Sequence, residues 1–294
     1  KAALSAYEKL TKEQKEYITE ADAAKFNELA KKVFNLSFEE WYQNGFWKEN
    51  YNPVSIVIEG KVVSNVSVNK CNMNYNGNIL KLLQLGTVMT APEYRGNGYV
   101  RILMDEIMKE YEGKVDGIYL YANDSVLDFY PKFGFVTKPE FQYSKHVINT
   151  ATDVTENIPM ETSEDWVKMV DIIKTRPQCG NMTMNGNEGL FMFYLSQFMK
   201  ENVYYVNSID TYVVAEVYGD TLMLYAIFGE ASIDDVITSF GSNISNVILF
   251  FTPIDKTGYE EKKVDEEDTT FFVKGKAFEL LGDYKFMLQA ITHA

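Results

Sequence analysis

The chain has 294 residues, of which 46% are hydrophobic, 14% aromatic and 24% charged. These proportions exclude a disordered or collagen-like chain and predict a globular protein of two domains with about 150 residues each. The formal charge is −14, from 28 basic and 42 acidic side chains. It argues against nucleic acid, because phosphate binding needs a basic face, and it favours a cationic partner.

The cysteines and the start of the chain bear on its compartment. Cys71 and Cys179 are far apart and lack the spacing of a disulfide framework or a zinc site. The first residues contain no apolar run long enough for a signal peptide or a membrane span. Two isolated histidines, His146 and His293, add no metal-ligand pattern. We therefore expect a cytoplasmic protein without a metal and without membrane attachment.

Hydrophobic periodicity predicts the elements of the first half of the chain. In chain order they are a helix at 19–34, a short helix at 37–45, strands at 54–58, 62–68 and 82–89, a helix after 98, a strand at 118–122, a short helix at 125–133 and a closing strand at 141–145. The strongest pattern follows Gly98, where apolar residues recur at helical spacing as far as Tyr111. Pro131 should end or kink the short helix.

A polar stretch at 150–162 predicts a linker, so we place the domains at 1–150 and 151–294. The elements predicted beyond it are helices at 166–173 and 189–199, strands at 203–206, 211–217 and 222–228, a helix at 232–240 and a strand at 247–251. The order of helices, meander, helix and strand repeats that of the first half. We therefore expect a structural repeat. The run at 260–268 is interpreted as a solvated loop.

One loop in the first half has the features of an anion site. Gly96 and Gly98 lie between a strand and a helix start, and they carry no side chain that would keep a phosphate from the backbone amides. Arg95 adds a cation. The loop lacks the GxxxxGK[ST] pattern of P-loop enzymes and is too short for the GxGxxG dinucleotide pattern. The loop therefore indicates a pyrophosphate site of another kind.

Two motifs resemble those of a known superfamily. LGTVMTAPEYRGNG at 85–98 resembles motif A of the GNAT N-acetyltransferases, and YLYANDSVLDFYPKFGF at 119–135 resembles their motif B. The resemblance covers most of residues 17–145. It implies an α+β fold of tandem acetyltransferase-like lobes, each a central mixed, mostly antiparallel sheet flanked by helices. It also implies acetyl transfer from acetyl-CoA to the primary amine of a small molecule or a peptide, by direct attack in a ternary complex.

The resemblance also implies roles for single residues. Those that would bind the pantetheine arm and the pyrophosphate of acetyl-CoA are Val88, Met89, Thr90, Arg95, Gly96, Asn97, Gly98, Tyr99 and Val100. Val100 stands where the family usually has Gly or Ala. Asn123 matches a position that contacts pantetheine or the acetyl group. Tyr130 matches the residue that protonates the departing thiolate.

A general base is not evident from the sequence. Gln84 and Thr87 stand where some relatives carry Glu, although attack on the thioester needs a neutral amine. Two-lobed relatives of the enhanced-intracellular-survival type use the terminal carboxylate of the chain. By this resemblance Ala294 is a candidate base, with a docked tail as the alternative.

The second half should be a degenerate acetyltransferase-like lobe that does not bind CoA. In its matching loop Arg and the paired glycines are missing, and Glu230, Asp234 and Asp235 would repel phosphate. Two other functions stay open. A non-catalytic acyl-CoA-binding or sensor protein would keep the first loop, and a tandem amide-forming ligase that uses aminoacyl-tRNA is disfavoured by the acidic charge.

Overall fold

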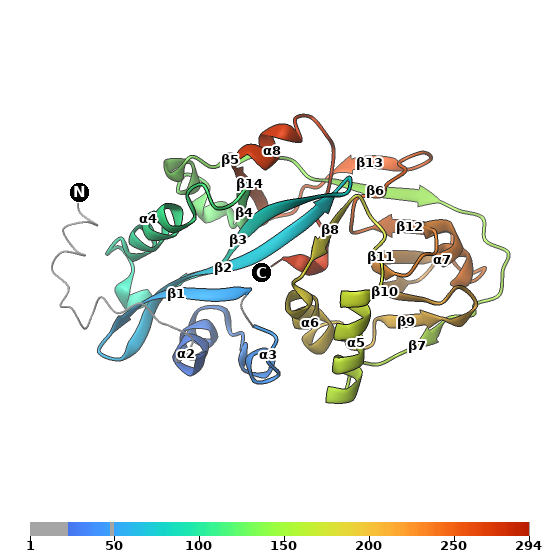
Figure 1. Ribbon diagram of the computed structural model, residues 1–294, viewed down its shortest axis with the longest axis horizontal. Coiled ribbons are helices and arrows are strands. Elements are labelled where there is room, and N and C mark those ends of the chain that lie inside the picture. The colour runs from blue at the N-terminus through green and yellow to red at the C-terminus, as the bar shows by residue number, and fades with distance from the viewer. Residues whose placement is uncertain (1–22, 48–49, 294) are drawn as a thin grey trace.

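The computed structural model describes residues 23–47 and 50–293. The elements of the first half are α2 (Ala23–Phe34), α3 (Glu39–Gln43), β1 (Tyr51–Ile58), β2 (Lys61–Tyr75), β3 (Asn78–Thr90), α4 (Tyr99–Tyr111), β4 (Gly117–Ala122), β5 (Val136–Thr137) and β6 (Phe141–His146). Two sheets, each flanked by helices, stand side by side (Figure 1).

The second half of the chain contributes strands to both sheets. Its elements are β7 (Glu156–Asn157), α5 (Ser163–Thr175), β8 (Met182–Asn185), α6 (Glu188–Gln197), β9 (Val203–Val206), β10 (Thr211–Tyr218), β11 (Thr221–Phe228), α7 (Ile233–Ser239), β12 (Asn246–Leu249), β13 (Glu260–Lys263), β14 (Thr270–Lys274) and α8 (Lys276–Leu280). As in the first half, the described helices are short. None of the described helices is long and apolar enough to cross a membrane.

The two sheets have the same design. The first runs β1-β2-β3-β4-β14-β5, with β8 paired to β2, and the second runs β13-β6-β12-β11-β10-β9-β7. Each contains one parallel pair, β3 with β4 and β11 with β12, while the other pairs are antiparallel. The α+β fold of two tandem lobes with mixed, mostly antiparallel sheets is thereby confirmed.

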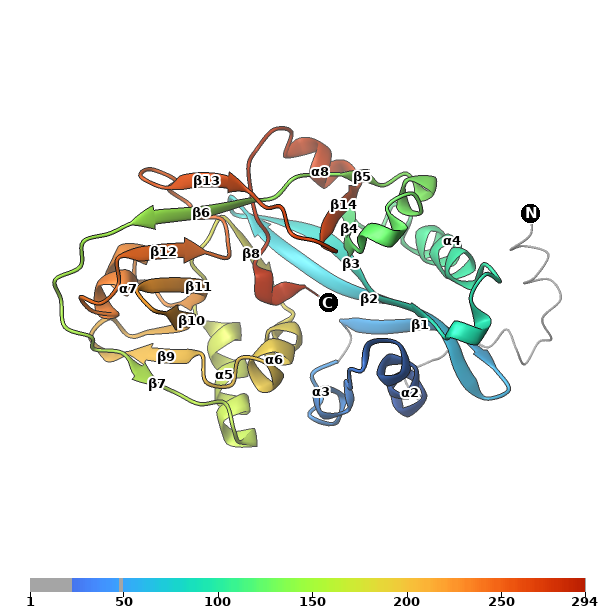
Figure 2. The same cartoon turned by 180° about the vertical axis from the view of Figure 1, so that it is seen from behind.

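Strands are exchanged between the two halves of the chain. β6, from before residue 150, pairs with β12 in the second sheet. β14, from the second half, pairs with β4 in the first sheet. Figure 2 shows β6 running into the second sheet and β14 lying beside β4. The sheets therefore do not divide at residue 150, and the domain boundary placed there stays a prediction.

The helices cover both faces of the first sheet. α4 buries one stripe, which includes Leu103, Met104 and Ile107, against strand residues such as Val66 and Leu120. Its i, i+1, i+4 spacing is that of the apolar face read from the sequence. α2 packs on the opposite face, in a large core shared with α5 and α6 of the other lobe. That face of the first sheet therefore looks toward the second lobe.

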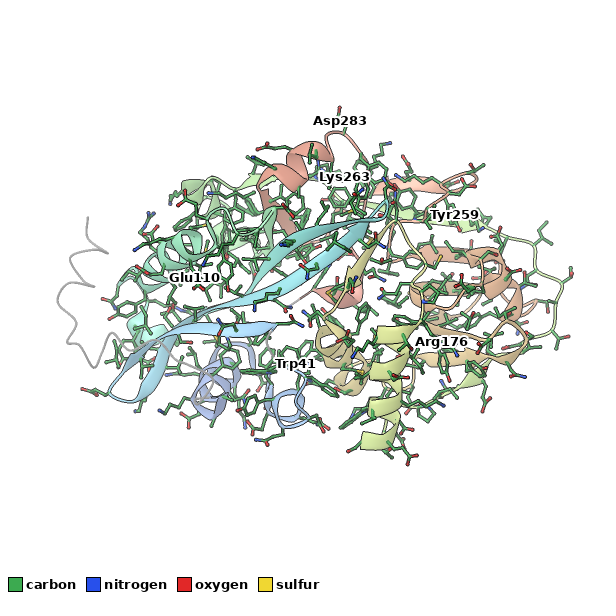
Figure 3. The ribbon with its side chains drawn as sticks, in the orientation of Figure 1. Trp41, Glu110, Arg176, Tyr259, Lys263 and Asp283 are labelled. Atoms are coloured by element: carbon green, nitrogen blue, oxygen red, sulfur yellow. The ribbon has the colours of Figure 1, made fainter. Side chains whose placement is uncertain are left out.

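Hydrogen bonds and ring packing join the two lobes directly. Trp41 lies at their boundary (Figure 3), and its Nε1 donates a hydrogen bond of 2.6 Å to the carbonyl of Gly189. Phe38 and Phe193 stack with ring centroids 5.4 Å apart. A Cβ on Gly189 would lie 1.9 Å from the carbonyl oxygen of Phe46, so a glycine is required there. The halves form one packed body.

Several predicted elements need correction. The helix predicted at 19–34 is seen from Ala23 onward, since residues 19–22 lie outside the described part. Two 3-10 turns, Asp124–Val126 and Tyr130–Phe133, replace the short helix at 125–133, consistent with the break expected at Pro131. The loop prediction at 260–268 is wrong for its first part, because Glu260–Lys263 forms an exposed edge strand on β6. Charged side chains are typical of such edges.

Candidate active site

The two parallel strands of the first sheet separate at their carboxyl ends. β3 and β4 are paired only from Leu82 with Gly117 to Gln84 with Tyr119. Beyond this point β3 continues to Thr90, paired with β2 on its other side alone. Its backbone groups on the β4 side are therefore open. An extended molecule with amide groups could pair with them as an added strand.

A bulge in β3 marks the separation. The register with β2 shifts between Asn65 and Ser67, and Thr87 has a φ of 46°. This conformation is unfavourable for a β-branched residue and concentrates at functional sites. The Thr87 hydroxyl shares a 2.8 Å hydrogen bond with that of Tyr51, and its carbonyl accepts from the Asn65 amide at 2.9 Å. These contacts hold the bulge in place.

A cavity of about 840 Å³ opens between the separated strands. Its lining contains nearly all of the residues expected to bind the cofactor, namely Val88, Met89, Thr90, Arg95, Gly96, Gly98, Tyr99, Val100 and Asn123, together with Tyr130. Asn97 lies in the same loop outside this lining, and its side chain donates to the carbonyl of Tyr94 at 2.9 Å. The structure thus brings these predicted residues together around one space.

The loop before α4 offers free amides to this cavity. Gly96 and Gly98 have φ values of 80° and 78°, which turn the chain into the helix start. The Arg95 amide donates to Pro92 and the Ile102 amide to Gly98. Among the described residues, no acceptor pairs with the amides of residues 96–101. Amides at a helix start and the nearby Arg95 guanidinium form an anion site.

Tyr130 lies in the wall of the cavity. Its ring packs on Phe129 and Phe272, and 4% of the residue is exposed. Burial raises the pKa of Tyr130 to about 12, so the phenol is protonated at neutral pH. Within the described chain its hydroxyl has no hydrogen-bond partner and is free to donate a proton. The ring is also part of the hydrophobic core under α4, and its role as a proton donor stays a prediction.

Asn123 follows β4 at the rim of the cavity. Its carbonyl accepts from the Val126 amide at 3.1 Å, while its side chain makes no capping bond and is exposed. The amide group is therefore available to a ligand. Val100, in the first turn of α4, is half-buried, and its side chain forms part of the cavity wall.

The end of the described chain lies against the same region. His293 stacks on Tyr121, with ring centroids 3.9 Å apart, and its carbonyl accepts from the Tyr194 hydroxyl at 2.6 Å. Tyr121 lines the cavity. Ala294, the candidate base, lies outside the described residues, and its role stays a prediction. Its neighbour His293 nevertheless places this part of the chain next to Tyr121.

The motifs did not indicate every residue of the wall. Val33 and Phe34, at the end of α2, also line the cavity, as does Arg101 in the first turn of α4. Only the folded arrangement of α2 on the sheet brings the first two there. Tyr121 stands inside the second motif, and alternation along β4 could have assigned it to the face opposite α4. No cluster of metal-ligating side chains occurs among residues 23–47 and 50–293.

Comparison with known proteins agrees with this geometry. Residues 15–137 match the family model described as an acetyltransferase (GNAT) domain. A search of curated proteins found no significant match. The matched segment ends before β6 and thus contains β3, the loop, α4 and β4. The family assignment therefore concerns the lobe that contains the cavity.

Three crystal structures have similar folds. A conserved Enterococcus faecalis protein described as a probable N-acyltransferase has a TM-score of 0.60 at 15% identity, covering 89% of this chain and 71% of its own. A Kribbella flavida GCN5-related N-acetyltransferase has 0.56 at 15%, covering 88% and 70%. An Anabaena variabilis GCN5-related N-acetyltransferase has 0.55 at 14%, covering 88% and 72%. At these identities the likeness is one of fold, and it extends over both lobes.

Proposed function

Residues 15–137 belong to the GNAT acetyltransferase family, and from this we propose that the protein is an N-acetyltransferase. The donor is acetyl-CoA and the acceptor is the primary amine of a small molecule or a peptide. The carrying observation is the row of unpaired amides at residues 96–101 beside Arg95, at a cavity that also contains the Tyr130 hydroxyl. The amides and the guanidinium suit the negative charge of the pyrophosphate of an acyl-CoA.

The proposed position of the donor follows from the open groups. The pyrophosphate lies on the amides before α4, where the helix dipole and Arg95 favour negative charge. The pantetheine arm pairs with the open edge of β3 at Val88, Met89 and Thr90. Asn123 contacts it from the end of β4. The acetyl group then lies where β3 and β4 separate.

The transfer is a direct attack on the thioester. The neutral amine attacks the carbonyl carbon, the C–S bond breaks, and the thiolate takes a proton from the Tyr130 hydroxyl. The nitrogen gives up its excess proton as the amide forms, and this proton restores the Tyr130 phenol. A positioned proton donor of this kind contributes about 10²- to 10⁴-fold to a rate. The thiolate is thereby released as a thiol.

The net charge of −14 supports a cationic amine as the partner rather than nucleic acid or an anionic membrane. Free thiols at Cys71 and Cys179 fit a cytoplasmic location. Cys71 is fully buried, and burial raises the pKa of its thiol to about 12. It is therefore no candidate for an acyl-cysteine intermediate.

Acetyl-CoA binding and thiol release over a panel of amines test the proposal. We expect binding by calorimetry, and release of free CoA with at least one amine. Arg95→Ala should weaken binding about tenfold or more, since a hydrogen bond to a charged group contributes about 1.5–3 kcal/mol. Arg176→Ala, in the other lobe and paired with Asp210, is the control that should leave binding unchanged.

Two outcomes would change the assignment. Binding without thiol release from any amine would favour the acyl-CoA sensor. No binding at saturating acetyl-CoA would exclude both functions.

A further inference from the structure

The face of β4 opposite α4 contains a group of buried polar side chains. Leu120 and Ala122 point into the core under α4, whereas Tyr119 and Tyr121 point the other way, toward the second lobe. The hydroxyl oxygens of both tyrosines are buried, and neither has a hydrogen-bond partner within the described chain. Unpaired buried hydroxyls are rare in folded proteins and call for an explanation.

Tyr121 joins this group to the cavity. Its ring lies between Phe271, at 5.0 Å, and His293, at 3.9 Å between ring centroids. These contacts fix the ring, and the residue lines the cavity that we assign to acetyl-CoA. Tyr121 and Tyr130 belong to cores on opposite faces of the sheet. Tyrosines from both faces of the sheet therefore line the same cavity.

Glu140 is the buried carboxylate of this group. It lies just before β6 with 6% of its surface exposed, and its Oε1 accepts from the Leu288 amide at 2.8 Å. Across the described residues no Lys, Arg or His forms an ion pair with it. A buried carboxylate without a cation is costly to keep ionised. Such a group is more often found where it exchanges protons.

Several groups act on the pKa of Glu140. Burial raises it to about 7, the Leu288 amide and the Tyr121 hydroxyl lower it, and Glu266 raises it. The carboxylate in turn raises the pKa values of Tyr119 and Tyr121. The Tyr121 hydroxyl is near enough for this mutual effect, but its geometry is not that of a hydrogen bond.

Resting on the proposed function, we propose that Glu140 receives the proton that the acceptor amine must lose, and that the Tyr121 hydroxyl passes it on. An ammonium group in the cavity gives a proton to the Tyr121 oxygen while Tyr121 gives its own to the Glu140 carboxylate. The products are a neutral amine, an intact phenol and a carboxylic acid. The amine then attacks, and Tyr130 protonates the thiolate on the other face. The excess proton on the attacking nitrogen restores the Tyr130 phenol as the amide forms.

Three variants test this division of roles. Glu140→Gln keeps an oxygen for the Leu288 amide but cannot take up a proton. We expect its kcat to fall about 10²- to 10⁴-fold, with the KM for acetyl-CoA unchanged. Tyr121→Phe should lose kcat to a similar extent by breaking the relay. Glu266→Gln, which changes an exposed neighbour, should keep kcat at alkaline pH.

The dependence of kcat on pH distinguishes a proton acceptor from a structural carboxylate. Glu140 must be ionised to act, so wild-type kcat should fall as the pH drops through about 7. This acid limb should disappear in Glu140→Gln. In Glu266→Gln it should move to lower pH, because the charge that raises the pKa of Glu140 is removed. An unchanged acid limb in Glu140→Gln would contradict the proposal.

A weakly basic aromatic amine gives a second readout. It is neutral at the assay pH and needs no initial deprotonation, so the loss in Glu140→Gln should shrink with it. An equal loss for both amines would show a structural role and overturn the inference. If Glu140→Gln folds poorly by thermal unfolding, Tyr121→Phe carries the same comparison, and wild-type kcat in it would overturn the relay.

Activity of the wild-type protein distinguishes failure of the proposed acetyl transfer from failure of the proposed role of Glu140. If it transfers acetyl to no amine, the proposed function fails and this inference with it. If it transfers acetyl while Glu140→Gln keeps wild-type kcat and pH dependence, this inference alone fails.

Discussion

Both lobes place a loop and a helix after a strand of their parallel pair, yet the two helix starts differ. Before α4 the amides of residues 96–101 have no partner within the described chain. At the start of α7 a capping box pairs two amides: the Ser232 hydroxyl accepts from the Asp235 amide at 3.1 Å, and the Asp235 carboxylate accepts from the Ser232 amide at 3.3 Å. The second lobe thus pairs two amides at its helix start with its own side chains, whereas the first lobe leaves its amides open.

The space beside the strands differs in the same way. In the second lobe Gln178 bridges Phe228 at the end of β11, and the Asn181 amide donates to the Thr252 carbonyl beyond β12. The chain itself therefore lies against the ends of the parallel strands. In the first lobe the corresponding place is the cavity of about 840 Å³. The two lobes therefore share a sheet design but differ at the ends of their parallel strands.

Among the changes that test this difference between the lobes, removing the hydroxyl of Tyr130 should have the largest effect, and the effect is on turnover. Tyr130→Phe keeps the ring packing on Phe129 and Phe272 but removes the proton donor. We expect turnover to fall about 10²- to 10⁴-fold with acetyl-CoA affinity unchanged. Steady-state kinetics and calorimetry measure the two quantities. Wild-type turnover in this variant would remove Tyr130 from the mechanism.

Substituting one glycine in each lobe should separate a loss of stability from a loss of acetyl-CoA binding. Gly96 and Gly219 have φ values of 80° and 63°, and a Cβ on either would meet open space. Valine at each should lower the free energy of unfolding by about 1–2 kcal/mol, because left-handed backbone disfavours side chains. Only Gly96→Val should also weaken acetyl-CoA binding, by about tenfold or more. Equal affinities in the two variants would place the pyrophosphate elsewhere.

Opening the cap of α7 should have the smallest effect. Asp235→Ala removes half of the capping box and should lower the free energy of unfolding by about 1 kcal/mol. Calorimetry should still give one acetyl-CoA per chain, because the segment around Gln178 keeps the second space filled. A second bound molecule would mean that the cap alone blocks this lobe.

The sequence predicts the site better than it predicts the sheets. The loop at Arg95 to Gly98 and the helix after it are specified locally, by glycines at left-handed positions and by apolar spacing. Most of the cavity lining therefore lies within two motifs, whereas Val33 and Phe34 reach it only through the packing of α2. Tyr130 lines the cavity, and its role as the general acid stays a prediction.

Long-range pairing is what local patterns miss. Residues 141–145 were expected to close their own lobe, but β6 joins β12 and β13 instead, and β14 was not foreseen. Alternation along a strand predicts which side chains share a face, but it does not predict which neighbouring strand the chain pairs with. Glu140 escaped notice for a related reason. Its carboxylate accepts from the Leu288 amide, which is distant in the sequence.

The exchange of strands makes each half of the chain a necessary part of the other. A fragment ending near residue 150 would expose the edge of β4 that β14 covers, right beside the wall that holds Tyr121. The complementary fragment would leave β12 without β6. The second half of the chain therefore acts as a scaffold for the first lobe, whatever the capped start of α7 binds. Removing the second half would disturb the wall of the candidate active site without changing any residue of the loop.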